Sequence, residues 1–544
     1  MYLLKIPGLL LSGLIVIAVS ASANSGDHQH NVGHIHFPVS CTPEGQKTFE
    51  QGVALLHSFW YDEAGKTFAD LIRLEPNCAM AYWGVAMSLY HPVWFPPTQS
   101  DLRKGVAAIE RANSIGAKTQ RERDYIAAIE QFYRDSDKVP HRQRALAWRN
   151  GMQRIWTSYP EDHEAAIFYA LALIATASPA DKTFTNQKQA AAILYRMLAQ
   201  QPGHPGIAHY LIHSYDSPQL AHLALPAARA YAKIAPDSAH ALHMPSHIFT
   251  RLGLWDESIR SNLASAAAAK SQMVGTRPAA TSQDQLHAMD YLSYAYLQTC
   301  EDEKASRIVN EAASVSRLDQ QVFQAAYAFA AIPARYALER RRWSVAATLQ
   351  VRPAWFPWAN FREAEAITHF ARAVGSARSG NTREARAALE ALTETAREVG
   401  HRKQDYDWPT QIEVQRLTAL AWLSHAEGHQ TPALHSMRAA ADLEDSMEKH
   451  PVTPGPVLPA RELLGELLLE LNQPARALTQ FEQVLRSSPN RFNAIYGAAR
   501  AAELCRDRKT ATERYSQLLQ LCGHPEAQRL ELQNARAFLD AHRN

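Results

Sequence analysis

Two features of many nucleic-acid-binding and membrane proteins are missing from this 544-residue sequence. Its 56 basic and 54 acidic residues give a formal net charge of only +2, which argues against bulk binding to nucleic acid or a charged membrane surface. No stretch approaches the roughly 18–20 consecutive apolar residues that a membrane-spanning helix requires. We therefore expect no nucleic-acid partner and no membrane span, although a 46% hydrophobic content leaves ample material for a core.

The sequence also lacks the motifs of several common enzyme classes. It contains no glycine-rich phosphate loop, no G-x-S-x-G nucleophile turn and no H-E-x-x-H zinc motif. Ser246 lies between two histidines, but a serine inside a helix lacks the exposed turn of a nucleophile, so we interpret it as a small packing residue. We predict no catalytic residue and no organic cofactor site. The scarcity of enzymatic motifs favours a non-catalytic protein over an enzyme.

Cysteine is scarce, with five residues, which fits an exported protein with a few disulfides. Cys41 precedes the first helical repeat described below and Cys78 closes it, so these two form the favoured pair. Cys505 and Cys522 end the two helices of the last repeat and form a second candidate pair. Cys300 is left over and is predicted to be a small buried residue.

The N-terminus has the pattern of an export signal. A short segment with one lysine, Met1–Lys5, precedes the apolar run Leu9–Val19, and Ala21-Ser-Ala23 has the small-x-small form of a cleavage site. We expect cleavage near Ala23 and a periplasmic or secreted protein. The following segment carries His28, His30, His34 and His36. Such a segment can collect metal ions, but a flexible polar leader is the commoner case and is the interpretation that we favour.

A recurring pattern of small and aromatic residues appears at both ends of the chain. Counted from Gly45 as position 1, Gly52, Ala64, Phe68 and Pro76 occupy positions 8, 20, 24 and 32, and from Leu458 the same positions hold Gly465, Ala477, Phe481 and Pro489. This pattern resembles the tetratricopeptide repeat, whose period is 34 residues. The resemblance implies an all-α fold, an α-solenoid of roughly eight to ten helix hairpins without a sheet.

The repeat pattern and its interruptions divide the chain into six segments. We expect a signal peptide at 1–23, a histidine-containing flexible leader at 24–44, N-terminal repeats at 45–158, central histidine-rich repeats at 159–320, irregular helical repeats at 321–450 and C-terminal repeats at 451–544. The proline-rich run at 450–459 is predicted to be a non-helical crossing.

Histidine pairs with i, i+4 spacing occur twice in the central segment, 34 residues apart, as His209 with His213 and His243 with His247. The spacing puts each pair on one helix face. By the repeat count, both pairs occupy positions 5 and 9, which in the resembling family line the concave groove. Position 2 holds His240 and His287 in successive units, and the third unit has Asp290 at position 5 and Tyr294 at position 9.

Such a group of imidazoles and a carboxylate favours a transition metal: zinc, copper, nickel or iron. The candidate ligands are His209, His213, His240, His243, His247, His287 and Asp290. Further groove-facing candidates are Asp216, Arg251, Tyr294, His57 and His91. Pro245 cannot donate a hydrogen bond to the carbonyl four residues back. Unless Pro245 lies in the first turn of a helix, we expect a kink there, and the pattern does not predict the geometry of His240 and His243.

Two functions of different class follow. The favoured one is an exported, non-catalytic repeat protein that binds a protein, peptide or other ligand in its groove, with a His-coordinated metal ion as one means of binding. The alternative is a metalloenzyme with an open coordination position in the same groove. The sequence also allows these histidines to be hydrogen-bonded packing residues, and repeat duplication makes their recurrence less surprising.

Overall fold

The packing of small residues against aromatic rings sets the geometry of the helix pairs. In the first pair, a Cβ added at Gly52 of α1 (Pro43–His57) would lie 2.7 Å from the ring of Phe68 in α2 (Tyr61–Leu74). Gly465 and Phe481 make the same contact, also at 2.7 Å, between α22 (Ala460–Glu470) and α23 (Pro474–Ser487). Positions 8 and 24 of the repeat therefore meet as the sequence pattern predicts.

The computed structural model describes residues 30–542 apart from 94–95, 179–180, 278, 401–405 and 524–526. The expected signal peptide, with its cleavage site, and His28 lie outside these residues. Within them the regular structure is helical, with one isolated bridge between Thr281 and Leu318 and no strand. In the same described ranges, no helix is both long and apolar enough to cross a membrane.

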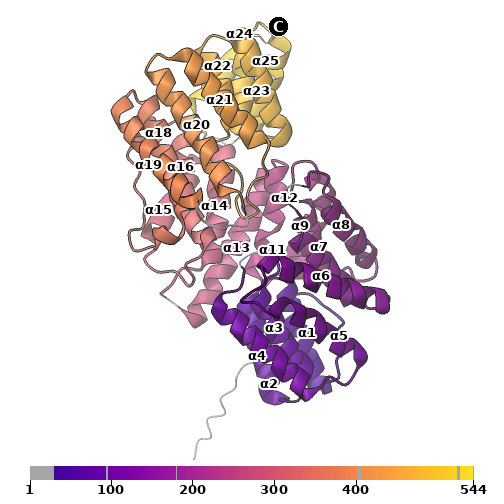
Figure 1. The fold of residues 1–544 in the computed structure, drawn as a ribbon. Coiled ribbons are helices and arrows are strands. Elements are labelled where there is room, and N and C mark those ends of the chain that lie inside the picture. Colours follow the sequence, from indigo (N-terminus) through magenta and orange to yellow (C-terminus); the bar gives the residue numbers. More distant parts are fainter. Residues whose placement is uncertain are drawn as a thin grey trace, which may run out of the picture. The chain divides into compact units, whose positions relative to one another are not determined.

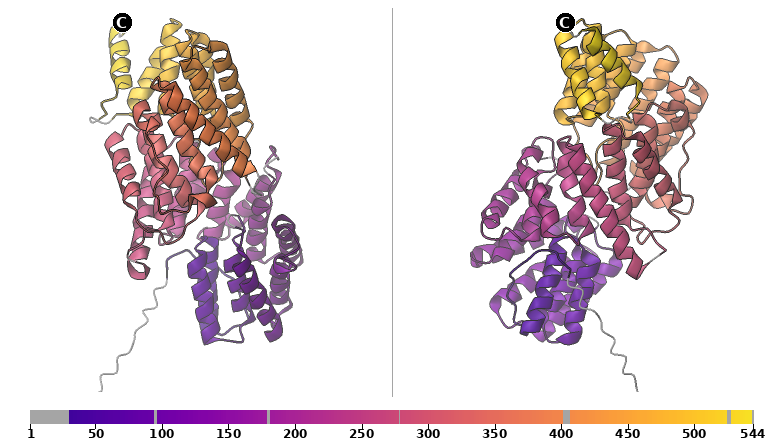
Figure 2. Two further views of the ribbon diagram at one scale, coloured as in Figure 1. Left: turned by 60° about the vertical axis from the view of Figure 1, so that its left-hand side comes forward. Right: turned by 180° about the vertical axis from the view of Figure 1, so that it is seen from behind.

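Within the described part of the chain, helices α1 to α25 form twelve consecutive pairs, when α11 and α12 are counted as one interrupted helix, and α26 follows them. Neighbouring helices lie side by side along the chain (Figures 1 and 2). After α1 and α2, the N-terminal helices are α3 (Ala79–Tyr90), α4 (Gln99–Ile115), α5 (Gln120–Tyr133), α6 (His141–Ser158), α7 (His163–Ala175) and α8 (Thr185–Leu198). The central helices are α9 (Pro205–Tyr215), the short 3-10 helix η1 (Ala221–Ala224), α10 (Leu225–Ile234), α11 (Ala239–His243), α12 (Pro245–Arg251), α13 (Trp255–Thr276), α14 (Gln283–Gln298) and α15 (Asp302–Ser314).

The remaining helices continue the array to the C-terminal end. They are α16 (Phe323–Glu339), α17 (Trp343–Ala347), η2 (Trp358–Asn360), α18 (Arg362–Arg378), α19 (Thr382–Gly400), α20 (Trp408–Ala426), α21 (Gln430–Asp445), α22, α23, α24 (Phe492–Leu504), α25 (Arg508–Leu521) and α26 (Leu530–Ala541). The expected eight to ten pairs were therefore too few. Units such as the one containing the five-residue α17 depart too far from the consensus to be found by the repeat pattern.

Two hydrophobic cores fill the array and divide between α12 and α13. The N-terminal core extends from Val32 to Phe249, and the C-terminal core begins at Trp255 and ends at Ala535. Most of the candidate metal ligands lie on α9, α11, α12 and α14, on either side of this division. The histidine-rich region therefore sits where the two cores adjoin.

The histidine-containing leader is ordered against the repeats from Asn31 onward. The Asn31 backbone N–H donates to the carboxylate of Asp237 (2.7 Å), and that of His34 donates to the Gly203 carbonyl (3.2 Å). Val32 and Phe37 are fully buried, and the ring centroids of Phe37 and Phe49 are 5.2 Å apart. Residues 31–44 of the leader expected at 24–44 therefore contact the repeats through backbone hydrogen bonds and buried apolar side chains.

Two disulfides link the chain, and one of them differs from expectation. Cys41 and Cys78 are bridged as predicted, with Cα atoms 5.5 Å apart. Cys522 is bridged to Cys300, with Cα atoms 5.6 Å apart, whereas Cys505 is exposed and unbridged. The candidate pair Cys505–Cys522 and the unpaired role of Cys300 are both wrong, because the fold brings together residues separated by 222 positions.

The proline-rich run at 450–459 is a non-helical crossing, as expected, and most of it is buried. It leads from α21 to α22 and passes the histidine-rich helices. The carbonyl of Val452 lies 3.3 Å from the hydroxyl of Tyr291 in α14, and the Gly455 carbonyl accepts a hydrogen bond from Arg335 in α16 (3.3 Å). This crossing therefore connects the C-terminal repeats to the central ones.

Candidate metal centre

Three successive repeats supply the histidines of the candidate site. His209 and His213 lie on α9, His240 and His243 on α11, and His247 on α12. Pro245 is the first residue of α12. An N–H at this position makes no intrahelical hydrogen bond, so a proline is tolerated there. The helix is interrupted at Met244, but the interruption leaves His243 and His247 facing each other.

The first group, site A, consists of His209, His213 and His240. The Nε2 atom of His209 lies 3.0 Å from Nε2 of His213 and 3.1 Å from Nε2 of His240. Two nitrogens bound to one tetrahedral zinc ion at 2.0–2.1 Å would lie about 3.3 Å apart. The three imidazoles of site A are thus already close to the separation of ligands around one ion.

The second group, site B, consists of His243, His247 and His287. The Nε2 atoms of His243 and His247 are 3.1 Å apart, and one ring nitrogen of His287 lies within 4.8 Å of both. His287 lies on α14, and its ring centroid is 4.4 Å from that of His243. Sites A and B therefore have the same composition in repeat terms: positions 5 and 9 of one unit and position 2 of the next.

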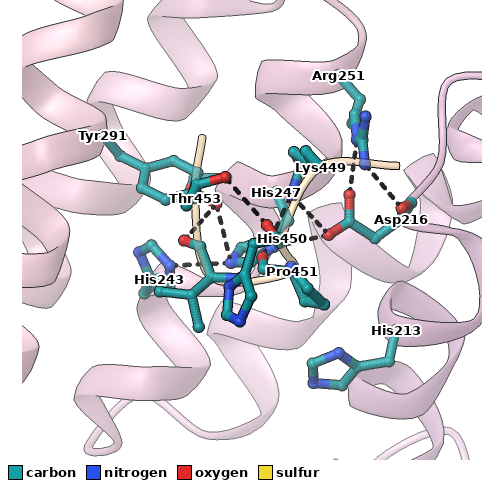
Figure 3. Close-up of polar contacts among 12 residues, drawn as sticks. His213, Asp216, His243, His247, Arg251, Tyr291, Lys449, His450, Pro451 and Thr453 are labelled. Atoms are coloured by element: carbon teal, nitrogen blue, oxygen red, sulfur yellow. Dashed lines mark hydrogen bonds and ion pairs between the residues drawn. The ribbon is translucent and has the colours of Figure 1, made fainter. Parts of the chain in front are cut away.

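The hydrogen bonds at Nδ1 determine where the protons of site B lie, and Figure 3 shows the one between His247 and Asp216. His247 Nδ1 is 3.0 Å from a carboxylate oxygen of Asp216, which only accepts, so Nδ1 carries the proton. His243 Nδ1 is 2.7 Å from Oδ1 of Asn262, whose amide nitrogen donates to the Ser258 carbonyl (2.8 Å). Nε2 of both neutral histidines therefore carries a lone pair, and two lone pairs face each other across 3.1 Å. The Tyr291 hydroxyl, 3.3 Å from His247 Nε2, can donate to one of these lone pairs, whereas a metal ion between the two nitrogens would bind both.

Site A has an analogous support on His209. Its Nδ1 donates to the backbone carbonyl of His57 (2.7 Å), which again leaves the lone pair on Nε2. A donor bond from Nδ1 to a carbonyl or carboxylate is the usual way in which proteins orient a metal-binding histidine. His209, His243 and His247 are almost fully buried, so these orientations are fixed by packing as well as by hydrogen bonds.

Burial keeps the imidazoles neutral. It is the main cause that lowers the pKa of all six histidines of sites A and B, and the pKa of His243 falls to about 3. Neighbouring imidazoles add to the effect because two like charges at this distance repel. A proton is therefore a poor occupant of the space between the facing nitrogens, whereas a metal ion binds the neutral form.

Asp216 connects site B to two cations. Its carboxylate accepts from Arg251 Nε (2.9 Å) and from Lys449 Nζ (3.3 Å) in addition to His247. Burial acts to raise the pKa of Asp216, but Lys449, Arg251 and His247 together hold it well below 3.8. Lys449 belongs to the segment that enters the proline-rich crossing, so a distant part of the chain helps to orient a candidate ligand.

A third group, His57, Glu164 and His204, is a hydrogen-bonded network whose ring nitrogens are all occupied. Both histidines donate from Nε2 to the carboxylate of Glu164 (2.8 Å each). His57 Nδ1 lies 2.9 Å from the Tyr210 hydroxyl, and His204 Nδ1 accepts from the Gly206 N–H. The network leaves no lone pair for an ion and instead fixes the His57 carbonyl that orients His209.

An aromatic ring lies against each histidine group. The ring of Phe59 has its centroid 4.4, 5.5 and 5.6 Å from those of His209, His213 and His240. The ring of Tyr291 is 4.7, 5.1 and 5.5 Å from those of His243, His247 and His287. Sequence reasoning missed both residues, although Tyr291 stands one helical turn after His287.

Other expected site residues lie elsewhere. Asp290 is buried in an ion pair with Arg335 (2.5 Å) and belongs to neither histidine group. His57 is fully buried in the network with Glu164 rather than facing a groove. His91 packs its ring 4.4 Å from that of Tyr61. The structure brings together the six histidines of sites A and B that the repeat count placed on one face, whereas the count did not give the partners of Asp290, His57 and His91.

A cleft of about 650 Å³ opens beside site B. Arg251 and Tyr294, two of the expected groove residues, line it together with the aromatic side chains of Tyr327, Tyr406 and Trp408. Lys449 is also part of its wall. The two cations that hold Asp216 therefore face this cleft.

Comparison with known proteins adds little to these observations. No protein-family description matches the sequence, and neither does any functionally characterised protein sequence. Among solved structures, the chain is similar to the Cut9–Hcn1 heterotetramer of the APC/C, with 12% identity over 92% of this chain and 90% of that chain at a TM-score of 0.31. It is also similar to a monomeric mutant of IFIT1 with Gppp-AAAA, with 11% identity over 81% and 90% at a TM-score of 0.39. The human IFIT1 dimer with PPP-AAAA gives 12% identity over 89% and 92% at a TM-score of 0.35.

These identities and TM-scores are too low to transfer any function. The tetratricopeptide-like character of the fold rests on the helix pairs and their contacts described above. The expectation that no nucleic acid binds stays a prediction from the net charge.

Proposed function

We propose that this is an exported helical-repeat protein that binds two transition-metal ions, one at site A and one at site B. The observation that carries the proposal is the pair of Nε2 lone pairs of His243 and His247, 3.1 Å apart and fixed by Asn262 and Asp216. Zinc, copper, nickel and iron all accept neutral imidazole, so the ligand set leaves the choice among them open.

Repetition of the same arrangement in site A supports the proposal independently. Ordinary core packing favours apolar side chains at buried positions. Here three polar rings of each group converge on one point in two successive units. An ion in each group would bind the converging nitrogens of three buried imidazoles at once.

The rings of Phe59 and Tyr291 favour binding over catalysis. Each ring lies against all three imidazoles of its site and occupies space that a substrate would need near the ion. The metalloenzyme alternative requires an open coordination position reached by a substrate. It is therefore the weaker of the two functions.

The cleft beside site B supports a second role, the binding of a protein or peptide partner. Its wall combines aromatic rings with Arg251 and Lys449, the side-chain types that recognise peptides in a groove. The wall also includes the carboxyl groups of Glu363, Glu444, Asp445 and Glu448. Since both cations also contact Asp216, a partner with an acidic group would compete for them. Metal binding and partner binding would then act on each other through Asp216.

Export is part of the proposal and rests on two observations. The two disulfides are typical of proteins that fold in an oxidising compartment, and the N-terminus carries the signal pattern. Intact-mass measurement of the secreted or periplasmic protein should give a chain that starts near Asn24. Recovery of a chain that retains Met1–Ser20 would count against export by this route.

Metal stoichiometry tests the main proposal. Metal-free protein dialysed against Zn(II), Cu(II) or Ni(II) should retain two ions per chain by elemental analysis. His213→Ala and His247→Ala should each retain one ion, and the double variant should retain none. His36→Ala, which changes an exposed histidine of the leader, should retain two.

The control for folding is circular dichroism, which should show the same helix content in all variants. A wild-type protein that binds none of these ions, or a double variant that still binds two, would contradict the proposal.

A further inference from the structure

Sites A and B each contain three histidines, but they differ in the aromatic ring that covers them. The ring over site A is Phe59, which has no polar atom, whereas the ring over site B is Tyr291, which has a hydroxyl. The hydroxyl oxygen lies 3.3 Å from Nε2 of His247. This distance is about the separation expected between two ligands of one tetrahedral ion.

We infer that Tyr291 is a fourth metal ligand, so that site B is a three-nitrogen, one-oxygen site for a divalent ion whereas site A offers three nitrogens only. The inference rests on the proposed function and goes beyond it, because it makes the two sites chemically different. Tyr291 is buried beside the imidazoles, so little movement is needed for its oxygen to reach an ion held by His243, His247 and His287.

The charges around site B support an oxygen ligand. Asp216 contacts His247, but Arg251 and Lys449 both pair with this carboxylate, and their two positive charges more than offset its single negative charge. A divalent ion in a buried site needs a negative donor to offset its charge. The Tyr291 oxygen supplies that donor when the phenol coordinates as the phenolate and releases one proton to solvent.

The second contact of Tyr291 does not compete with this role. Its hydroxyl is also 3.3 Å from the Val452 carbonyl in the proline-rich crossing. Without an ion, the single phenol proton is shared between His247 Nε2 and this carbonyl. With an ion, His247 Nε2 uses its lone pair for the metal, and the phenol no longer donates to it.

Copper spectroscopy separates the two sites. A Cu(II)–phenolate bond gives a charge-transfer band in the visible region, which a site of imidazoles alone lacks. The variant His213→Ala, which retains only site B, should show this band when loaded with one Cu(II). The variant His247→Ala, which retains only site A, should bind one Cu(II) without the band.

The deciding variant is Tyr291→Phe, which keeps the ring and removes the oxygen. In the His213→Ala background it should abolish the band and weaken Cu(II) binding by at least about tenfold, the scale of losing a supporting group of a metal site. The matched control is Tyr133→Phe, because the buried Tyr133 hydroxyl donates to the Ala86 carbonyl and not to the site; it should leave band and affinity unchanged.

The outcomes distinguish this inference from the proposed function. A His213→Ala protein that binds one Cu(II) without the band, or a band that survives Tyr291→Phe, overturns the role of Tyr291 and leaves the two-ion proposal intact. Failure of the wild-type protein to bind any Cu(II) overturns both.

Discussion

The orientation of His247 depends on one carboxylate. Asp216 accepts the Nδ1 proton of His247 and is itself held by Arg251 and Lys449. Replacement of Asp216 by Asn removes the charge but keeps the size, and the amide can present a donor to Nδ1, which favours the wrong tautomer. We expect Asp216→Asn to weaken metal binding at site B by about 10–100-fold, the usual effect of losing such a partner.

Titration of Asp216→Asn with Zn(II) in the His213→Ala background measures site B alone. The same substitution in the His247→Ala background serves as the control, because site A should be unaffected. An equal loss of affinity at both sites would show that Asp216 acts through the fold rather than through His247.

A second histidine-based effect involves His450 and pH. His450 lies among the rings of Phe323, Tyr406 and Trp408, and burial, aided by the nearby Lys449 charge, lowers its pKa to about 3. In the unfolded chain its pKa is about 6.5, so between pH 6.5 and 3 the unfolded state binds more protons at this residue. Above pH 6.5, His450 is neutral in both states and does not lower the free energy of unfolding. As the pH falls to 5, protonation of His450 in the unfolded state lowers the free energy of unfolding by about 2 kcal/mol.

The variant His450→Asn isolates this contribution. The amide can accept the Val452 N–H that His450 Nδ1 accepts (3.2 Å), but it does not titrate. The free energy of unfolding, measured with urea between pH 8 and 5, should fall by about 2 kcal/mol more in the wild-type protein than in the variant. Parallel pH profiles would contradict the assignment.

Part of the residue-scale picture was predictable from sequence. The i, i+4 histidine pairs and their 34-residue separation indicated which side chains share a helix face. The partners of those side chains were not predictable, since Lys449 is 233 residues from Asp216 and Phe59 carries no pattern of its own. The placement of Asp290 failed for the same reason: the sequence does not show that Arg335 reaches it.

At the scale of helices, the close approach of α1 and α2 depends on Gly52. A Cβ at this position would lie 2.7 Å from the Phe68 ring, well inside contact distance. Gly52→Ala gains about 1 kcal/mol of helix propensity but forces the ring to move, and overpacking costs about 1–3 kcal/mol. We expect a net loss of up to about 2 kcal/mol, seen as a lower Tm.

Gly203→Ala provides the matched control, because no heavy atom lies within 4 Å of its added Cβ. It should change the free energy of unfolding by less than about 0.5 kcal/mol. The double variant Gly52→Ala with Phe68→Leu should lose less stability than the two single losses together. Additive losses would show that the two residues do not meet as described.

The helix pairs at both ends were the most predictable elements, since glycine at position 8 and phenylalanine at position 24 have a direct steric reason. The interrupted helix α11–α12 and the five-residue α17 were not predictable by the same pattern. Their boundaries depend on tertiary contacts, such as those that keep His243 and His247 face to face across the break at Met244.

At the scale of the whole chain, the two disulfides close loops of very different length. Cys41 and Cys78 are separated by 37 residues, and Cys300 and Cys522 by 222. The chain-entropy relation gives about 4 kcal/mol for the shorter loop and about 5 kcal/mol for the longer one. Replacing Cys300 and Cys522 by Ser should therefore destabilise the protein more than replacing Cys41 and Cys78.

Urea unfolding of the two double variants tests this order. Cys505→Ser is the control and should have no measurable effect, because Cys505 is exposed and unbridged. A larger loss from the Cys41–Cys78 variant would indicate that the N-terminal loop is closed by weaker contacts than the chain-entropy relation assumes. The longer link was beyond sequence reasoning because it joins the ends of two helices from different repeats.

Three contacts between the central and C-terminal repeats constrain how the chain can change in evolution. Trp255 donates to the Asn490 carbonyl (2.8 Å), Arg529 pairs with Asp302 (2.5 Å), and Cys300 is bonded to Cys522. An open solenoid gains or loses repeats readily, since each unit touches only its neighbours. A unit added or deleted between Trp255 and Arg529 would move the two partners of each contact apart. These contacts therefore constrain the number of units between them. The units between α2 and α9 are constrained in the same way, because the His57 carbonyl accepts a hydrogen bond from His209.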